Sequence, residues 1–475
     1  MFERNSTAGG RSTTVNAYDD PSLPIELGAS IFVDVNTILN DAVKEFNLST
    51  DEFMPDVDIS GPALGVWNGQ KFVLKMNSGW WDTAKLLWKY GLAPVRTMRL
   101  MNKVVGQFSE MYEAPIFPFE SLTQAAEDLG LLAVTAATGE QYLAENGITG
   151  RFGWDVVQAS TRVNYATNLK YIHGLEAMVC MAASGGKAVR GGNWQIFDHM
   201  IIASNATTRF GTEVKEIEKQ KEGSYLLSFV GVSSEVETYD HSQQLFDSVI
   251  LAAPYQFADL DISASTKDVP DKIPYVQLHV TLFTTPHLPS PAFFNLKQGT
   301  PVPRSILTTL ADDEEPKEGN AGVGSPGFFS ISLLRPITNP HTGGQEYAYK
   351  IFSAEQPNST FLTHLLGLKL SPDSDIDPSS GVSRKDITWI YRKLWSSYPY
   401  EYPRVTFEKI QLDENLWYTS GMDSFISAME SNALSGMNVA RLVVDKWAEE
   451  VGAVGYGRML ESEMEMEEMG GAREV

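Results

Sequence analysis

Apolar and polar positions divide the first third of the chain into strand-like and helix-like segments. Residues 1–4 have the pattern of a strand end and 25–33 that of a second strand. Over 37–46 the apolar residues recur at helical spacing instead. An Asn-Gly turn within 66–73 predicts a β-hairpin. Two helical patterns follow, over 80–90 and 95–111.

The rest of the chain predicts a second group of elements. A helix is expected at 194–203, and strand-like alternation follows at 212–218 and 225–229. The run 246–252 is almost continuously apolar, which is typical of a buried parallel strand. A long helical pattern at 420–447 carries small residues on one face. The chain therefore mixes helices with parallel and antiparallel strands.

Composition and charge narrow the class of protein. The 475 residues are 43% hydrophobic and 20% charged, values ordinary for a globular protein of two or three domains. A formal net charge of −23 argues against a nucleic-acid partner, because phosphate would be repelled. No apolar run approaches the roughly 18 residues that span a bilayer, so no transmembrane segment is expected. The acidic, Met-rich end, 456–475, is expected to be disordered.

The single cysteine, Cys180, excludes an intrachain disulfide and a cysteine-based metal site, and no metal is expected. Cys180 lies in an apolar run, which favours a buried structural thiol over a nucleophile. The first residues lack the basic and apolar regions of a secretory signal. Four sequons give weak support for glycosylation, at Asn5, Asn47, Asn205 and Asn358.

The first candidate binding motif lies near the start of the chain. Glu3 ends the predicted strand, where an acidic residue of a dinucleotide fold accepts hydrogen bonds from ribose hydroxyls. Gly9 and Gly10 follow and allow the backbone to approach a phosphate closely. Arg11 comes next and is suited to pairing with a pyrophosphate. The alternative is a solvated turn with surface charges.

A second motif combines Val214 with the apolar strand that ends in Ala252-Ala253-Pro254. Small residues at that strand end let a backbone pass close to a ligand. Val214 would then offer main-chain groups to an adenine from a neighbouring strand. The alternative is that these residues are core strands and a turn.

The third motif combines Asp423 with the helix that follows it. The helix start near 427–429, including Met429, would direct free N–H groups at an electron-rich ring edge, such as the C2 carbonyl of a flavin. Small residues along the helix allow a close backbone approach. An Ala/Ser/Gly packing helix is the alternative interpretation.

In this order the three motifs resemble the flavin-binding elements of the FAD-dependent amine-oxidase-like superfamily. The turn at 189–193, the stretch 275–281 and Trp417-Tyr418 before Gly421-Met422-Asp423 and Met429-Glu430 resemble the prenylcysteine oxidase, or prenylcysteine lyase, family. The resemblance runs over almost the whole chain, is weakest in 290–390 and is absent after about 455.

The resemblance implies an α/β fold, α+β overall, of the two-domain glutathione-reductase-like type with interleaved domains. FAD-binding segments are expected at 1–60, 185–265 and 406–455, and substrate-domain segments at 61–184 and 266–405. Members of the family begin with a secretory signal and a strand–GxGxxG–helix unit. This chain starts where the next strand would end, so we expect an N-terminally truncated sequence without the first βα unit.

The implied activity is FAD-dependent oxidation of the thioether of farnesyl- or geranylgeranylcysteine. The products are cysteine, a prenyl aldehyde and hydrogen peroxide, with oxygen as acceptor, in the breakdown of prenylated proteins. The implied location is a lysosome or vacuole. His173 and His279 lie in the expected substrate domain, but structural histidines are more common, so no residue is assigned as catalytic.

Two alternative functions remain open. One is another flavin oxidase acting on an amine or polyene; amine oxidases of this type often use a lysine near the flavin, and the sequence identifies none. The other is a non-catalytic prenyl-binding protein that lacks FAD.

Overall fold

The computed structural model describes residues 1–52, 60–77, 80–232, 242–263, 265–369, 377 and 379–449. The expected disordered end, 456–475, lies outside these residues. The helices are α1 (Thr37–Glu45), α2 (Trp80–Tyr90), α3 (Ala93–Ser109), α4 (Leu122–Asp128), α5 (Leu132–Thr135), α6 (Gly139–Glu145), α7 (Gln158–Tyr165), α8 (Gly174–Val179), α9 (Trp194–Ala203), α10 (Ser359–Leu366) and a final helix over 429–449. Of these, α1, α2 and α9 confirm the helices predicted at those positions.

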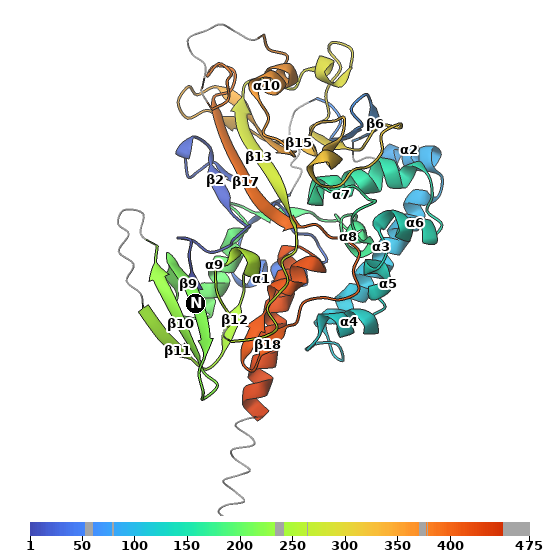
Figure 1. The fold of residues 1–475 in the computed structure, drawn as a ribbon. Coiled ribbons are helices and arrows are strands. Elements are labelled where there is room, and N and C mark those ends of the chain that lie inside the picture. Colours follow the sequence, from blue (N-terminus) through green and yellow to red (C-terminus); the bar gives the residue numbers. More distant parts are fainter. Residues whose placement is uncertain are drawn as a thin grey trace, which may run out of the picture.

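A seven-stranded sheet forms the centre of the upper half in Figure 1. Its strands, in spatial order, are β17 (Trp389–Pro399), β13 (Tyr275–Thr285), β16 (Gln345–Ser353), β15 (Ser330–Thr338), β14 (Ser305–Thr308), β5 (Leu64–Trp67) and β6 (Phe72–Met76). The β5–β6 hairpin confirms the predicted Asn-Gly turn, in which Asn68 Oδ1 accepts hydrogen bonds from the Gln70 and Lys71 amides.

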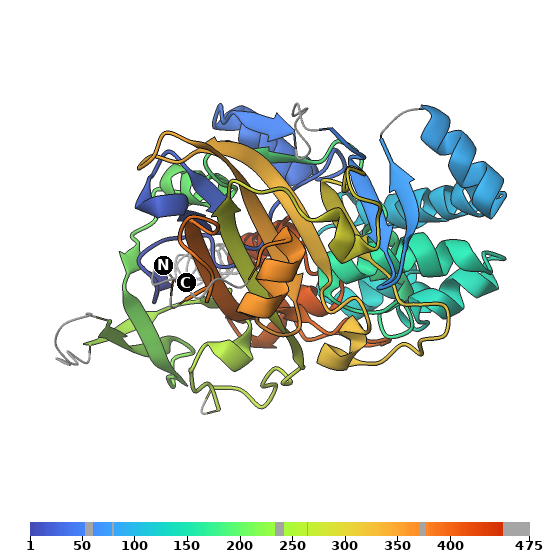
Figure 2. The same cartoon turned by 90° about the horizontal axis from the view of Figure 1, so that it is seen from above.

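Helices α2 to α8 gather beside this sheet, and Figure 2 shows them as a separate group at one side. The reason is visible in α3, where Thr97, Leu100, Val104 and Phe108 recur at helical spacing and are buried. Leu100, Val104 and Phe108 join one apolar cluster with α4 to α8 and with the final helix. Burial of this face holds the helical layer against the end of the chain.

The lower half contains smaller sheets. A three-stranded antiparallel sheet has the order β11 (Ser242–Phe246), β10 (Tyr225–Gly231), β9 (Thr212–Lys219). A second sheet has the order β12 (Val249–Leu251), β19 (Leu416–Tyr418), β18 (Gln411–Asp413). Three pairs complete the described strands: β1 (Phe2–Glu3) with β8 (Arg209–Phe210), β2 (Thr14–Asn16) with β3 (Pro24–Glu26), and β4 (Thr50–Glu52) with β7 (Lys187–Val189).

Three predictions need correction. The run 246–252 does contain a parallel strand, β12, but Ile250 is exposed, so the strand is not covered on both faces. The strand predicted at 25–33 ends at Glu26, because the residues after it form a loop that Gly28 allows to pack closely. The helix predicted at 420–447 is a short 3₁₀ turn, Ser420–Ser424, then a break, then the helix 429–449. That break lets Asp423 and the helix start face the same centre.

Candidate functional site

The Gly9-Gly10 turn directs Arg11 toward the C-terminal part of the chain. Both glycines have positive φ angles, +106° and +56°. A Cβ on Gly9 would lie 2.4 Å from the Ser12 carbonyl oxygen, so this turn requires glycine. A Cβ on Gly10 would meet nothing within 4 Å, so the backbone borders open space. The turn is therefore fixed on one side and accessible on the other.

Arg11 and Asp423 form an ion pair at the centre of the site, in which one guanidinium nitrogen contacts both carboxylate oxygens. Arg11 Nη2 lies 2.9 Å from Asp423 Oδ1 and 2.7 Å from Oδ2, and the Asp423 side chain is 1% exposed. Arg11 Nη1 donates to the Ser397 carbonyl at 2.7 Å, which joins the pair to β17. Burial lowers the pKa of Arg11, but Asp423 and Tyr275 raise it by more, so the guanidinium stays charged. The N-terminal turn, the large sheet and the final helix therefore meet at this pair.

Two further side chains hold Asp423 in place. The Tyr275 hydroxyl donates to Asp423 Oδ2 at 3.1 Å, and Asn432 Nδ2 donates to Oδ1 at 2.9 Å. Burial and then Asp423 raise the pKa of Tyr275, so it remains a donor. We call Arg11, Asp423, Tyr275 and Asn432 the Arg11 centre. The positive charge of Arg11 is balanced by the negative charge of Asp423, and each of the four residues comes from a different segment of the chain.

The start of the helix 429–449, which begins at Met429, borders the Arg11 centre through Ser427. Ser427 Oγ lies 3.4 Å from both Arg11 Nη1 and Asp423 Oδ1. Ser431 Oγ accepts from the Ala428 amide at 3.2 Å, which caps the helix start. Glu430 accepts from the Ile38 and Leu39 amides and so holds α1 against the same helix end.

The other two predicted binding residues lie in a different cluster. Glu3 accepts from the backbone and side-chain nitrogens of Asn5 at 2.7 and 2.9 Å. Val214 lies on β9 opposite Phe229 and packs in the same apolar cluster as Phe2. Glu3 and Val214 therefore lie near one another. Gly9, Gly10 and Arg11 follow Glu3 in the chain. Arg11 in turn contacts Asp423, which lies before the helix start at Met429. Their role in binding remains a prediction.

A buried lysine that sequence reasoning missed lies under the loop after Glu26. Lys350 Nζ donates to the Glu26 carbonyl at 2.9 Å and to Ser30 Oγ at 2.6 Å. Burial lowers the pKa of Lys350 to about 8 and raises that of the Glu26 carboxyl to about 7. The sequence pattern that could have identified Lys350 is a lysine inside the otherwise largely apolar second half of β16.

Gly28 brings this loop against the Arg11 centre. A Cβ there would lie 2.7 Å from the Trp395 ring and 2.9 Å from the Arg11 carbonyl oxygen. We expect Gly28→Ala to lower the free energy of unfolding by about 1–3 kcal/mol, because neither neighbour can move freely. Gly106→Ala is the control, since a Cβ in that part of α3 meets nothing within 4 Å, and it should add about 0.5–1 kcal/mol. Urea denaturation measures both; equal effects would contradict the close packing at Gly28.

A second group of polar residues is buried directly behind the Arg11 centre. It consists of His173, Glu176 and Glu401, which we call the buried acid cluster. His173 Nε2 lies 3.6 Å from Glu401 Oε2, and its Nδ1 accepts from the Glu176 amide at 3.1 Å. In the described part of the chain, neither carboxyl oxygen of Glu401 has a hydrogen-bond partner. Burying a carboxyl group without a hydrogen bond costs free energy of folding, so few native proteins contain one without a reason.

Burial sets the protonation of this cluster. It raises the pKa of Glu176 to about 8, although the Tyr165 hydroxyl and the Ser427 amide act in the opposite direction. The pKa of Glu401 is raised well above its usual range, by burial first and then by Glu176 and Asp423. Burial, with Arg404, lowers the pKa of His173 to about 3. The cluster is therefore neutral or shares protons near pH 7.

The buried acid cluster connects to the Arg11 centre through Tyr165 and Ser427. The Tyr165 hydroxyl donates to the Ser427 carbonyl at 3.0 Å, and Ser427 also approaches Arg11. Cys180 is buried beside the cluster, which confirms the predicted buried thiol, and burial raises its pKa. Of the two histidines considered from sequence, His173 lies in the cluster and His279 lies on β13. The sequence pattern that could have identified Glu176 as a buried polar residue is a carboxylate inside an apolar run.

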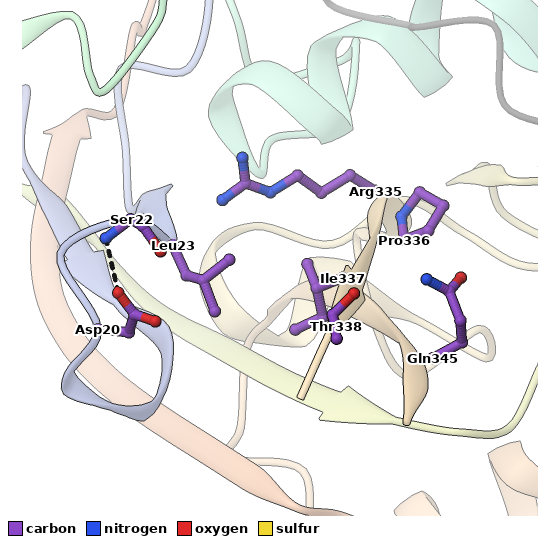
Figure 3. A pocket seen from close by; sticks show the side chains of 8 residues that line it. All are labelled: Asp20, Ser22, Leu23, Arg335, Pro336, Ile337, Thr338 and Gln345. Carbon is purple, nitrogen blue, oxygen red and sulfur yellow. Dashed lines mark hydrogen bonds between the residues drawn. The ribbon is translucent and has the colours of Figure 1, made fainter. Parts of the chain in front are cut away.

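An open pocket of about 360 Å³ lies elsewhere, beside β2, β3 and β15 (Figure 3). In Figure 3 Asp20 and Arg335 lie on opposite sides of it, with apolar side chains between them. Arg335 donates to the Pro24 carbonyl at 2.9 Å, and Asp20 accepts from the Ser22 amide at 2.8 Å. The pocket shares no lining residue with the Arg11 centre or the buried acid cluster.

Solved structures with a similar fold have low sequence identity to this chain. A conjugated-linoleic-acid-producing fatty acid isomerase from P. acnes aligns with a TM-score of 0.53 at 12% identity, over 93% of this chain and 91% of the other. Cyclohexylamine oxidase from Brevibacterium oxydans aligns with a TM-score of 0.50 at 13% identity, over 94% and 93%. This likeness confirms the predicted mixed α/β fold; its glutathione-reductase-like detail remains a prediction.

Sequence comparison gives the family. Farnesylcysteine lyase from Arabidopsis thaliana is 28% identical over 94% of this chain and 82% of its own length. Prenylcysteine oxidase 1 from Homo sapiens is 26% identical over 94% and 83%. The family model described as prenylcysteine lyase matches residues 73–455. Because that match covers most of the chain, this protein belongs to the prenylcysteine lyase family.

Proposed function

We propose that this protein is a flavin-dependent oxidase that cleaves the thioether of prenylcysteine. The observation that carries the proposal is the family match over 73–455, together with relatives named for farnesylcysteine and prenylcysteine. The reaction consumes prenylcysteine, oxygen and water and releases cysteine, a prenyl aldehyde and hydrogen peroxide. We propose FAD as the flavin and oxygen as the acceptor. A lysosomal or vacuolar location, glycosylation and the six chain segments given above remain predictions.

The residues of the Arg11 centre fit a flavin. A guanidinium, a tyrosine hydroxyl, an amide side chain and a helix start converge there, beside the open space at Gly10. We propose that Arg11, Asp423 and the backbone near Met429 hold the flavin and its hydroxylated chain. Glu3 and Val214 would hold the ribose and adenine of FAD. A phosphate at Arg11 would compete with Asp423 for the guanidinium.

A flavin held at the Arg11 centre would supply the acceptor for a hydride from the carbon attached to the thioether sulfur. The protein must then position one water molecule and transfer its protons. Water adds to that carbon, the C–S bond breaks, and the cysteine sulfur leaves with a proton. The buried acid cluster suits the proton transfers because burial raises the pKa of Glu176, and the Glu401 oxygens have no hydrogen-bond partner in the described part of the chain. Tyr165 and Ser427 lie between this cluster and Arg11.

The prenyl chain needs an apolar surface that excludes bulk water. Phe425 lies two residues beyond Asp423, and its ring packs against Phe407 at 4.9 Å and Phe108 at 6.3 Å between centroids. These rings belong to the apolar cluster of the helical layer. We propose that this layer supplies the prenyl-binding surface, so that the thioether lies beside the Arg11 centre.

The test is to purify the chain, release bound flavin by denaturation and identify it by mass. Farnesylcysteine turnover is then followed by peroxide release and by detection of farnesal. We expect FAD in stoichiometric amount and equal yields of peroxide and aldehyde. Turnover of amines but not farnesylcysteine would contradict the proposal and would make Lys350 the residue to test next. Prenylcysteine binding without flavin would instead support a non-catalytic prenyl-binding protein.

A further inference from the structure

The α2–α3 hairpin exposes large apolar side chains at its tip. Trp88 is 90% exposed, and Leu87, Leu92 and Met98 are exposed beside it in the chain. We call these four residues the hairpin tip patch. Single exposed apolar residues are ordinary, but four within one hairpin, including a nearly fully exposed tryptophan, are not.

The outward direction of the patch follows from the packing of the hairpin. On α3 the buried face is formed by Thr97, Leu100, Val104 and Phe108, so Met98 lies outside it. On α2, Leu86 and Tyr90 pack inward, whereas Leu87 and Trp88 are exposed. Figures 1 and 2 both place α2 at the periphery of the helical layer, away from the small sheets of the lower half.

The charge of the hairpin is opposite to that of the molecule. Residues 80–109 contain Lys85, Lys89, Arg96, Arg99 and Lys103 against Asp82, a formal charge of five minus one, or +4. The rest of the chain therefore carries −27, since the total is −23. Lys89 pairs with Asp155, whereas Arg99 and Lys103 are exposed on α3. Lys85 pairs with Asp82 within α2, so the net positive charge of the hairpin is carried mainly by α3.

We propose that the hairpin tip patch docks on an anionic lipid bilayer. Tryptophan prefers the interface between headgroups and acyl chains, and leucine and methionine insert beside it. Lysine and arginine around the tip attract anionic headgroups. Among the described residues no helix is long and apolar enough to cross a membrane, so contact through this hairpin would be superficial.

The inference deepens the proposed function and rests on it for its purpose. A prenylated cysteine carries a long hydrocarbon chain and partitions into bilayers. The outer side of α3 carries Met98, Arg99 and Lys103, while Phe108 on its inner side contacts Phe425, two residues beyond Asp423. Docking would therefore place the source of substrate beside the layer that leads to the Arg11 centre.

The experiment is co-sedimentation of the full chain with phosphatidylcholine vesicles that contain or lack phosphatidylserine. We expect binding to the anionic vesicles that weakens as salt rises. Trp88→Ser with Leu92→Ser should weaken it by about tenfold or more, and Arg99→Glu with Lys103→Glu should do the same and remove the salt dependence. Trp447→Ser is the matched control, because this exposed tryptophan lies on the helix 429–449, outside the patch; its binding should equal that of the wild type.

Three results would overturn the proposal. They are no vesicle binding by the wild type, equal binding by the Trp88/Leu92 variant and the wild type, or self-association that the Trp88/Leu92 substitutions abolish. The last would identify the patch as a contact between copies. All variants change exposed residues, and their melting temperatures are compared first. Since vesicle binding is measured without substrate, it can fail or hold independently of farnesylcysteine turnover.

Discussion

Replacing Arg11 with methionine is expected to lower the free energy of unfolding by about 3 kcal/mol at neutral pH, because the substitution leaves Asp423 buried without a cation. Urea denaturation measures the loss. Arg11→Met combined with Asp423→Asn should be more stable than Arg11→Met alone, because no unpaired charge remains. The flavin content of the same variants tests the binding role of Arg11 separately.

The matched control is Arg190→Met. Arg190 pairs with Asp51 at 2.7 Å, but the two side chains are 69% and 55% exposed, so water screens the pair. The expected loss is about 1 kcal/mol or less. If Arg11→Met cost no more than Arg190→Met, the Arg11 centre would not hold the three parts of the chain together.

Local patterns predicted the elements whose formation depends on their own residues. The predictions of helix α9 and of the β5–β6 hairpin were correct, because apolar spacing and an Asn-Gly turn act over a few residues. The three predicted binding segments come together in part, since Arg11 contacts Asp423 across 412 residues. The order of the motifs suggested this contact, but no spacing rule gives its geometry.

Other features depend on contacts that sequence patterns do not encode. The loop after Glu26 is not a strand because Gly28 packs on Trp395 and Arg11, which lie in distant segments. The last helix begins at residue 429, after a break that follows the 3₁₀ turn Ser420–Ser424. In that turn, Asp423 contacts Arg11 from a distant segment of the chain. No local sequence pattern marks Glu401, yet the fold buries it beside His173. Long-range packing, not local propensity, decides these positions.

Replacing Glu401 with glutamine is expected to stabilise the protein at neutral and alkaline pH. The folded pKa of Glu401 is raised, by burial first and then by Glu176 and Asp423. Between its unfolded pKa and its folded pKa, the folded state therefore binds more protons than the unfolded state. This contribution to stability is complete at low pH and is lost as pH rises, by up to about 1.4 kcal/mol per pH unit. Glutamine does not titrate, and no hydrogen bond is lost because the carboxyl oxygens accept none in the described chain.

Urea denaturation from about pH 5 to about pH 9 compares the wild type, Glu401→Gln and the exposed control Glu222→Gln. The control should keep the wild-type slope, and Glu401→Gln should flatten it. Equal slopes in all three proteins would mean that Glu401 ionises as freely as a surface carboxylate. If Glu401 takes part in proton transfer, Glu401→Gln should also lower kcat by about 10²-fold or more without changing flavin content. Slower turnover at unchanged flavin content would place the effect of Glu401→Gln on the reaction and not on cofactor binding.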